Sequence, residues 1–337
     1  MFTTRNLVKI VFNTFLGFVF ILIWLQFVDI KEIFKTISDV NVIMLIPGVF
    51  FLLLAQIIRS IRLKIFLSPV KKIALKDLIF LNGCATMLNF LIPIRAGELA
   101  KGLYLSSNYD IPVAKALVWI FIDRFIDFVV IFGLAGVFLL LIPTKLPASI
   151  TFLTITIFII IIFFSYLIVY QTKSFKKIVN FLKFFLIVNS IKIYFERVSN
   201  FFIEAFSIFK RKPVEILALF IISAIGFAAD AGIWYFSFLA LNSNQDLLKL
   251  YLAQLLSALT YIIPAAPGYV GSAEASGLLI FSGVFEIDPN LASAMIVLFH
   301  IITAIFVIVF GITSIYFLKI NVGKILARIF KRQDNLT

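Results

Sequence analysis

Long uncharged apolar runs, separated by short charged segments, dominate the chain. A helix of about 20 apolar residues crosses the hydrocarbon core of a bilayer, so these runs predict membrane-spanning helices. The segment between the first two runs, residues 29–41, carries mixed charge, and we interpret it as a short loop. We expect six full spans, over residues 7–28, 42–66, 112–142, 150–170, 213–241 and 291–319. The pattern therefore predicts an all-α, polytopic integral membrane protein.

Two further apolar runs are interrupted, and the interruptions resemble each other. Residues 88–98 read LNFLIPIRAGE and residues 259–269 read LTYIIPAAPGY, with Pro93 and Gly97 each 171 residues before Pro264 and Gly268. Matched broken segments in two halves of a chain are typical of transporter folds. We expect re-entrant helical hairpins over 78–105 and 250–285. The predicted breaks are at Pro93, Gly97, Pro264, Pro267, Gly268 and Gly271.

Residues 171–212 form a long stretch outside the spans, with nine Lys/Arg and with apolar residues such as Phe175, Ile178, Leu182 and Phe185 at helical spacing. This pattern predicts an amphipathic segment on the anionic surface of a membrane.

Basic residues accumulate in cytoplasmic loops. One set of loops holds 22 Lys/Arg and the opposite set holds four, which places both termini in the cytoplasm. The two hairpins then enter from opposite sides, as in an inverted repeat. We interpret the chain as one domain over 1–337, with a first repeat at about 42–142 and a second at about 213–319.

Composition agrees with a membrane protein, since 62% of the 337 residues are hydrophobic and only 14% are charged. We attribute the net charge of +13 to cytoplasmic loops facing anionic lipid rather than to a nucleic-acid partner. One cysteine, Cys84, and one histidine exclude zinc clusters and leave no room for a nucleophilic triad. Glycine-rich phosphate loops and the common hydrolase motifs are missing, so we expect no cofactor, no metal and no catalytic residue.

Charges inside the predicted spans cost roughly 2.5–3.5 kcal/mol each on insertion scales, so they face protein or water. Asp123, Arg124 and Asp127 lie within residues 112–142, and Asp127 neighbours the other two on a helix surface. Two interpretations stay open for them. They form an ion pair that locks this helix to a neighbour, or Arg124 binds a phosphate while an aspartate exchanges protons.

Arg95, Glu98 and Lys101 follow the first break, where free backbone N–H groups at a helix start attract anions. We expect Arg95 to bind a headgroup, with an arginine that only reaches the membrane interface as the alternative. Glu274 follows Gly271 by three residues and either contacts substrate or stabilises the helix start.

Asp230 and His300 are isolated within their spans, and each is a candidate for charge balance or proton coupling. For His300 a satisfied core position is the alternative. Arg59 and Arg62 lie near a cytoplasmic helix end, where we expect both to extend toward the interface.

These residues carry a family resemblance. The patterns Asn89-x-x-x-Pro93-x-Arg95-x-Gly97-Glu98-x-x-Lys101, Asp123-Arg124-x-x-Asp127 and Pro264-x-x-Pro267-Gly268-x-x-Gly271-x-x-Glu274 resemble the lysylphosphatidylglycerol synthase transmembrane-region family over roughly residues 40–320. Lys101 stands where that family commonly has Arg, and Asp123 where it often has Glu. The resemblance implies a flippase-like domain that moves a modified phospholipid or a lipid-linked sugar between leaflets, with Asn89 added to the candidate substrate-binding residues. It also implies the stand-alone form, since the longest segment outside the membrane is too short for an aminoacyl-transferase domain.

We therefore expect a lipid flippase or scramblase of the cytoplasmic membrane whose partners are membrane lipids. Candidate substrate contacts are Asn89, Arg95, Glu98, Lys101, Arg124 and Glu274, and candidate charge-balancing or proton-coupling residues are Asp123, Asp127, Asp230 and His300. Two alternatives stay open: a membrane transferase, or a transferase partner, acting on polyprenyl-phosphate substrates, and a transporter of small soluble solutes. A homo-oligomer and a partner lipid-modifying transferase are further possibilities.

Overall fold

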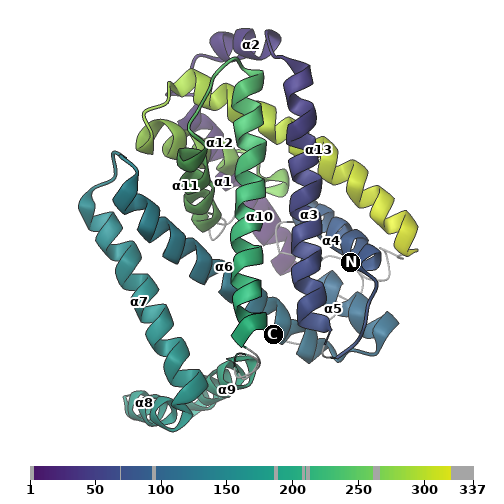
Figure 1. The fold of residues 1–337 in the computed structure, drawn as a ribbon, viewed down its shortest axis with the longest axis vertical. Helices are drawn as coiled ribbons and strands as arrows, with labels where there is room; N and C mark the ends of the chain where they lie inside the picture. Colours follow the sequence, from purple (N-terminus) through teal and green to yellow (C-terminus); the bar gives the residue numbers. More distant parts are fainter. Residues whose placement is uncertain are drawn as a thin grey trace.

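The structure is a computed structural model that describes residues 4–68, 70–92, 96–185, 189–206, 209, 213–260 and 266–319. Within these ranges every regular element is a helix, which confirms the all-α prediction (Figure 1). Pro93, Arg95 and Pro264 are not among these residues, so the predictions made for them lie outside the described part of the chain.

Five of the described helices are long and apolar enough to cross a membrane. They are α3 (Leu45–Leu67, extended at its start by the short turn Val42–Met44), α6 (Val113–Leu141), α7 (Ala148–Tyr170), α10 (Pro213–Ala240) and α13 (Pro289–Leu318). The remaining predicted span, residues 7–28, corresponds to α1 (Thr4–Trp24). Its apolar part, Val11–Trp24, is shorter than the ~20 residues that a bilayer requires. The membrane class is confirmed, and the number of six spans is not.

The prediction of a loop over residues 29–41 is wrong. The first helix ends at Trp24, and residues Ile30–Ser38 form a second helix, α2. The Asp29 carboxylate starts α2 by accepting the backbone N–H of Lys31 at 2.8 Å. Ile33 is only 3% exposed and packs in a core with residues of α10 and α13, so tertiary contact stabilises a helix too short to be stable alone.

The two interrupted runs form pairs of short helices. The first hairpin consists of α4 (Leu75–Leu91) and α5 (Ala96–Tyr109). The second consists of α11 (Leu247–Thr260), the turn Pro267–Tyr269 and α12 (Ser272–Leu278), which continues as a π-helical turn, Leu279–Val284. With 17 residues in α4 and 14 each in α5 and α11, none of these helices reaches the ~20 residues of a full span.

The helices α3 and α10 lie side by side and run in opposite directions (Figure 1). The backbone N–H of Asn41, just before α3, donates to the carbonyl of Ala240 at the end of α10 at 2.8 Å. The chain therefore leaves α3 and α10 at opposite ends of the molecule, and the two hairpins begin from opposite ends.

The packing of the two hairpins follows the same rule in both halves. Helix α4 packs against α13, and helix α11 packs against α6, so each hairpin contacts the last long helix of the other half. In Figure 1, α5 lies toward the end that carries α8 and α9, and α11 toward the end that carries α2.

The predicted amphipathic segment forms two helices, α8 (Thr172–Phe184) and α9 (Asn189–Phe206), at one end of the molecule (Figure 1). Phe175 and Val179 are buried against the long helices, whereas Phe184 is 81% exposed. Lys183 joins the two helices by an ion pair of 2.6 Å to Glu196, and this hydrogen bond and charge lower the pKa of the Glu196 carboxyl.

Candidate functional site

The first break is held by a side chain of its own hairpin. The side-chain carbonyl of Asn89, on α4, accepts the backbone N–H of Gly97 at 2.8 Å. A Cβ at position 97 would collide with the carbonyl oxygen of Ala85, so only glycine allows α5 to approach α4 this closely. Asn89, a predicted substrate residue, thus satisfies a free N–H at the start of α5.

The second break requires two glycines in left-handed conformations, Gly268 (φ 71°) and Gly271 (φ 82°). A Cβ on Gly271 would overlap the carbonyl oxygen of Gly17, so α1 lies directly against this break. The rings of Phe90, near the first break, and Tyr269, in the second, are 6.2 Å apart. The described parts of the two breaks therefore meet.

Glu274 and His300, which are 26 residues apart in sequence, are joined at the second break. One carboxylate oxygen of Glu274 accepts the Gly271 N–H at 2.7 Å, as expected for a residue that stabilises the start of α12. The other lies 2.7 Å from His300 Nδ1, and His300 Nε2 lies 2.6 Å from the carbonyl oxygen of Gly268.

This arrangement fixes the protonation of the pair. The carbonyl of Gly268 can only accept, so His300 Nε2 carries a hydrogen. The contact between Nδ1 and the Glu274 carboxyl then needs one proton, held either by the histidine or by the acid. Without that proton, two lone pairs would face each other at 2.7 Å. The pair thus holds one exchangeable proton at the point where the second hairpin turns.

A larger charged cluster lies where α3, α5 and α6 meet. Its centre is Arg62, whose side chain is only 4% exposed and whose Nε lies 2.7 Å from Asp123 Oδ1. The same guanidinium forms a two-pronged ion pair with Asp127. Ser223 of α10 donates a further hydrogen bond to Asp127 at 2.6 Å. The prediction that Arg62 extends toward the membrane interface is therefore wrong, because two carboxylates of α6 hold it inside.

The outer part of the cluster connects α6 to the first hairpin. Arg124 lies 3.2 Å from Glu98, 3.5 Å from Asp123 and 3.4 Å from Asp127, and its side chain is 42% exposed. Lys101 lies 3.4 Å from Glu98. We call this set the arginine–carboxylate cluster: Arg62, Glu98, Lys101, Asp123, Arg124 and Asp127.

A cavity of about 30 Å³ lies against the arginine–carboxylate cluster, and Asn82, Trp119 and Arg59 also line it. This is about the volume of one water molecule in the liquid, so the cavity is too small to hold a headgroup in this conformation.

Arg59 lies one turn before Arg62 on α3 but has a different partner. It forms an ion pair with Asp230 of α10. The two residues are 171 residues apart, the offset that relates the two proline–glycine stretches. In the predicted inverted repeat, a residue that contacts its own counterpart lies on the axis that relates the two halves. Arg59 is therefore also not an interface residue of the kind predicted, and Asp230 is not isolated.

Two of the predicted groups are brought together in space. Glu98, Lys101, Asp123, Arg124 and Asp127 form one cluster, and Glu274 and His300 form the pair at the second break. Reasoning from sequence missed Arg62, Arg59 and Ser223. The available signal was the spacing of Asp123 and Asp127 on one helix face, which needs a cation from another helix.

Comparison with known proteins agrees with a membrane protein. The family described as the lysylphosphatidylglycerol synthase TM region matches residues 7–311, a range that contains every predicted site residue. A protein of Methanocaldococcus jannaschii described as a UPF0104 membrane protein is 26% identical over 244 residues, which are 70% of this chain and 96% of that relative. No solved structure matches the chain.

Proposed function

This chain belongs to the lysylphosphatidylglycerol synthase transmembrane-region family, and on that premise we propose that it moves a polar lipid between the leaflets of the cytoplasmic membrane. It acts as a flippase or scramblase and not as an enzyme. The substrate is an anionic or modified phospholipid, or a lipid-linked sugar, whose chains stay in the bilayer while the headgroup crosses.

The proposed architecture has six spans, with α1 as the sixth, and two re-entrant hairpins that enter from opposite sides. It is supported by short helices on both sides of each break, by the opposite directions of α3 and α10, and by the contact between Phe90 and Tyr269. Both termini are cytoplasmic in this proposal, because the loops on the side of the termini hold 22 Lys/Arg and the opposite loops hold four. The two hairpins then form an inverted repeat.

The observation that carries the proposal is the arginine–carboxylate cluster, a buried charged network closed by a hairpin helix. Such charges within a membrane domain mark a pathway for a polar group. Arg124 is the accessible cation of the cluster, and its guanidinium suits a two-pronged contact with phosphate. Because the cavity beside it is too small for a headgroup here, α5 must move away from α6 before a headgroup enters.

The charge balance of the arginine–carboxylate cluster narrows the choice of headgroup. The cluster contains three cations and three carboxylates, so its formal charge is zero. A headgroup with only a phosphate would add an uncompensated charge, which is costly at low dielectric. When a headgroup carries both a phosphate and an amine, an ion pair inside the cluster can be replaced by ion pairs between the cluster and the headgroup. Among the substrates predicted from sequence, this favours a modified phospholipid.

The pair of Glu274 and His300 supplies proton coupling in this proposal. Its single proton holds the second break closed, and its loss sets a lone pair of His300 against the carboxylate. The aspartates of the arginine–carboxylate cluster are instead bound by Arg62 and balance charge.

Translocation in proteoliposomes tests the proposal. The purified full-length chain is reconstituted with fluorescent phosphatidylglycerol, or with an aminoacylated form of it, and the fraction of lipid reached by an outside quencher is followed in time. We expect faster loss of fluorescence than in empty vesicles, and a return to the empty-vesicle rate with Arg124→Gln. Arg197→Gln, at an exposed position of α9, is the matched control.

Two results would contradict the proposal. No lipid moves faster than in empty vesicles, or Arg124→Gln and Arg197→Gln behave alike. Product formation from a labelled polyprenyl-phosphate sugar by the pure protein would favour the transferase alternative.

A further inference from the structure

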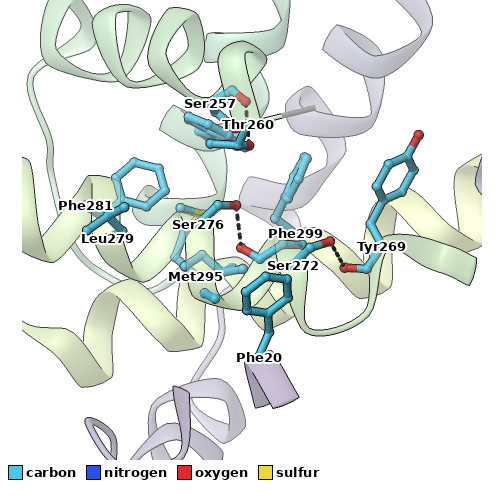
Figure 2. Close-up of a pocket in the computed structure, with 15 residues that line it drawn as sticks. Phe20, Ser257, Thr260, Tyr269, Ser272, Ser276, Leu279, Phe281, Met295 and Phe299 are labelled. Atoms are coloured by element: carbon cyan, nitrogen blue, oxygen red, sulfur yellow. Dashed lines mark hydrogen bonds between the residues drawn. The ribbon is translucent and has the colours of Figure 1, made fainter. Parts of the chain in front are cut away.

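A second and larger cavity lies beside the second break, away from the arginine–carboxylate cluster. It measures about 210 Å³ and is formed where α11, α12, α13, α10 and α1 meet (Figure 2). Its apolar wall includes Phe20, Trp234, Phe281, Met295 and Phe299. We call it the apolar pocket.

Three of the hydroxyl groups in the wall of the apolar pocket already donate to backbone carbonyls. Ser272 donates to the carbonyl of Tyr269 at 2.9 Å, and Thr260 donates to that of Ser257 at 2.7 Å. Ser276 likewise donates to Ala273 at 3.3 Å (Figure 2). Their protons are thus directed to backbone and not to an occupant, so a polar ligand would find few free donors.

Charged side chains are missing from the described residues that line the apolar pocket. Glu274 lies between two lining residues in sequence, yet its carboxylate contacts His300 and Gly271. A headgroup brought here would lose its hydration without gaining ion pairs, which is unfavourable.

The occupant must therefore be apolar, and the surroundings identify its source. Leu279, which lines the apolar pocket, is 66% exposed, so in the proposed architecture it faces the hydrocarbon of the bilayer. Lipid chains are the apolar groups present there, and a void of this size loses packing contacts if it stays empty.

We infer that the apolar pocket binds the end of one apolar lipid chain, acyl or prenyl. A volume of about 210 Å³ holds roughly seven methylene-sized groups, at the ~30 Å³ that one water molecule occupies in the liquid. The aromatic rings fix its shape, since Trp234 contacts Phe281 and Phe299 edge to face with ring centroids 4.9 and 5.9 Å apart.

The apolar pocket lies against the second break and the start of α12. Tyr269 and Ser272 line it, and Tyr269 also contacts Phe90 of the first hairpin. A chain bound there packs against the turn that holds the two hairpins together. The binding of an apolar lipid chain does not depend on the proposed function. Only the further step, that this lipid chain belongs to the transported lipid, rests on it.

Photolabelling tests the inference. The full-length protein is reconstituted in vesicles that contain either a phosphatidylglycerol with a diazirine near the end of one acyl chain or a polyprenyl phosphate with a diazirine near its end. After illumination, mass spectrometry locates the labelled residues. We expect label on Met295, Phe281 and Ser276 from one of the two probes, which identifies the kind of chain.

Ala275→Trp places an indole in the apolar pocket and should lower this labelling to the background on α7. Ala148→Trp, at an exposed position at the start of α7, is the matched control and should leave it unchanged. Ala275→Leu, a smaller filling, should give an intermediate loss and guards against misfolding of the tryptophan variant.

Even labelling of α7 and α13 by both probes, unaffected by Ala275→Trp, would overturn the inference, and so would the absence of label. Label that Ala275→Trp removes, in a protein that moves no lipid, would retain the chain site and remove the transport function. Loss of translocation together with loss of label would support both.

Discussion

The strongest energetic prediction concerns Arg62, the buried centre of the arginine–carboxylate cluster. Its side chain is 4% exposed and contacts two carboxylates of α6. Arg62→Met keeps much of the side-chain volume but leaves Asp123 and Asp127 facing each other without it. Removing one partner of a buried ion pair costs about 3–5 kcal/mol, because an uncompensated charge remains.

Arg124 provides the internal comparison. It contacts the same two aspartates at 3.4–3.5 Å, but its side chain is 42% exposed. Arg62→Met leaves both aspartates without their closest cation, whereas Arg124→Gln leaves Arg62 in contact with both. The structure therefore predicts that Arg124→Gln lowers the free energy of unfolding by clearly less than Arg62→Met.

Unfolding in mixed detergent micelles, with an increasing fraction of denaturing detergent, measures this difference through tryptophan fluorescence. Trp119 lines the small cavity and reports on the cluster directly. Neutralising the orphaned acids in the variant Arg62→Met/Asp123→Asn/Asp127→Asn should recover much of the lost stability. Equal costs for the two single variants, or no recovery in the triple variant, would refute the assignment of Arg62 as the buried centre.

Three further predictions concern the breaks and the axis. His300→Phe keeps the ring shape but removes the shared proton, so the backbone amides of 266–271 should exchange with solvent faster at all pH values in hydrogen-exchange experiments. In the wild type the same amides should exchange faster only once raised pH removes that proton, and equal protection in both proteins would contradict this. Gly271→Ala combines a left-handed φ of 82° with a collision, and should destabilise the fold by more than ~1–2 kcal/mol. Gly283→Ala, whose Cβ would meet its nearest neighbour at an ordinary 3.5 Å, is the control and should be tolerated. Arg59→Asp should lower the thermal midpoint and Asp230→Arg in the same chain should restore it, whereas a double variant no better than the single one would show that the pair contributes nothing.

The long helices and both breaks were predictable because length, proline and glycine act locally. The helix α2 was not predictable in the same way. It has nine residues, and its stability depends on capping by Asp29 and on burial of Ile33 against α10 and α13. Contacts with distant segments decide the conformation of such a short stretch.

The same limit applies to the charges. The spacing of Asp123 and Asp127 predicted that both lie on one face of a helix, and they do. Their main partner comes from α3, and no local rule identifies it. Arg59 and Arg62, three residues apart, even have partners on different helices, Asp230 on α10 and the aspartates on α6. Their position near a helix end predicted that both arginines reach the membrane interface. Tertiary packing instead buries Arg62 in the interior.

In the proposed inverted repeat, the pairing of Arg59 with Asp230 would also limit how the protein can assemble. Two identical halves related by a two-fold axis set the same side chain against itself on that axis. If two copies of the first half paired, two arginines would face each other, and if two copies of the second half paired, two aspartates would. Both contacts are repulsive at low dielectric. Opposite charges at this position make the halves mutually selective. The first half prefers the second half as its mate over another copy of itself, which keeps the fold closed within one chain and disfavours exchange of halves between neighbours in a crowded membrane.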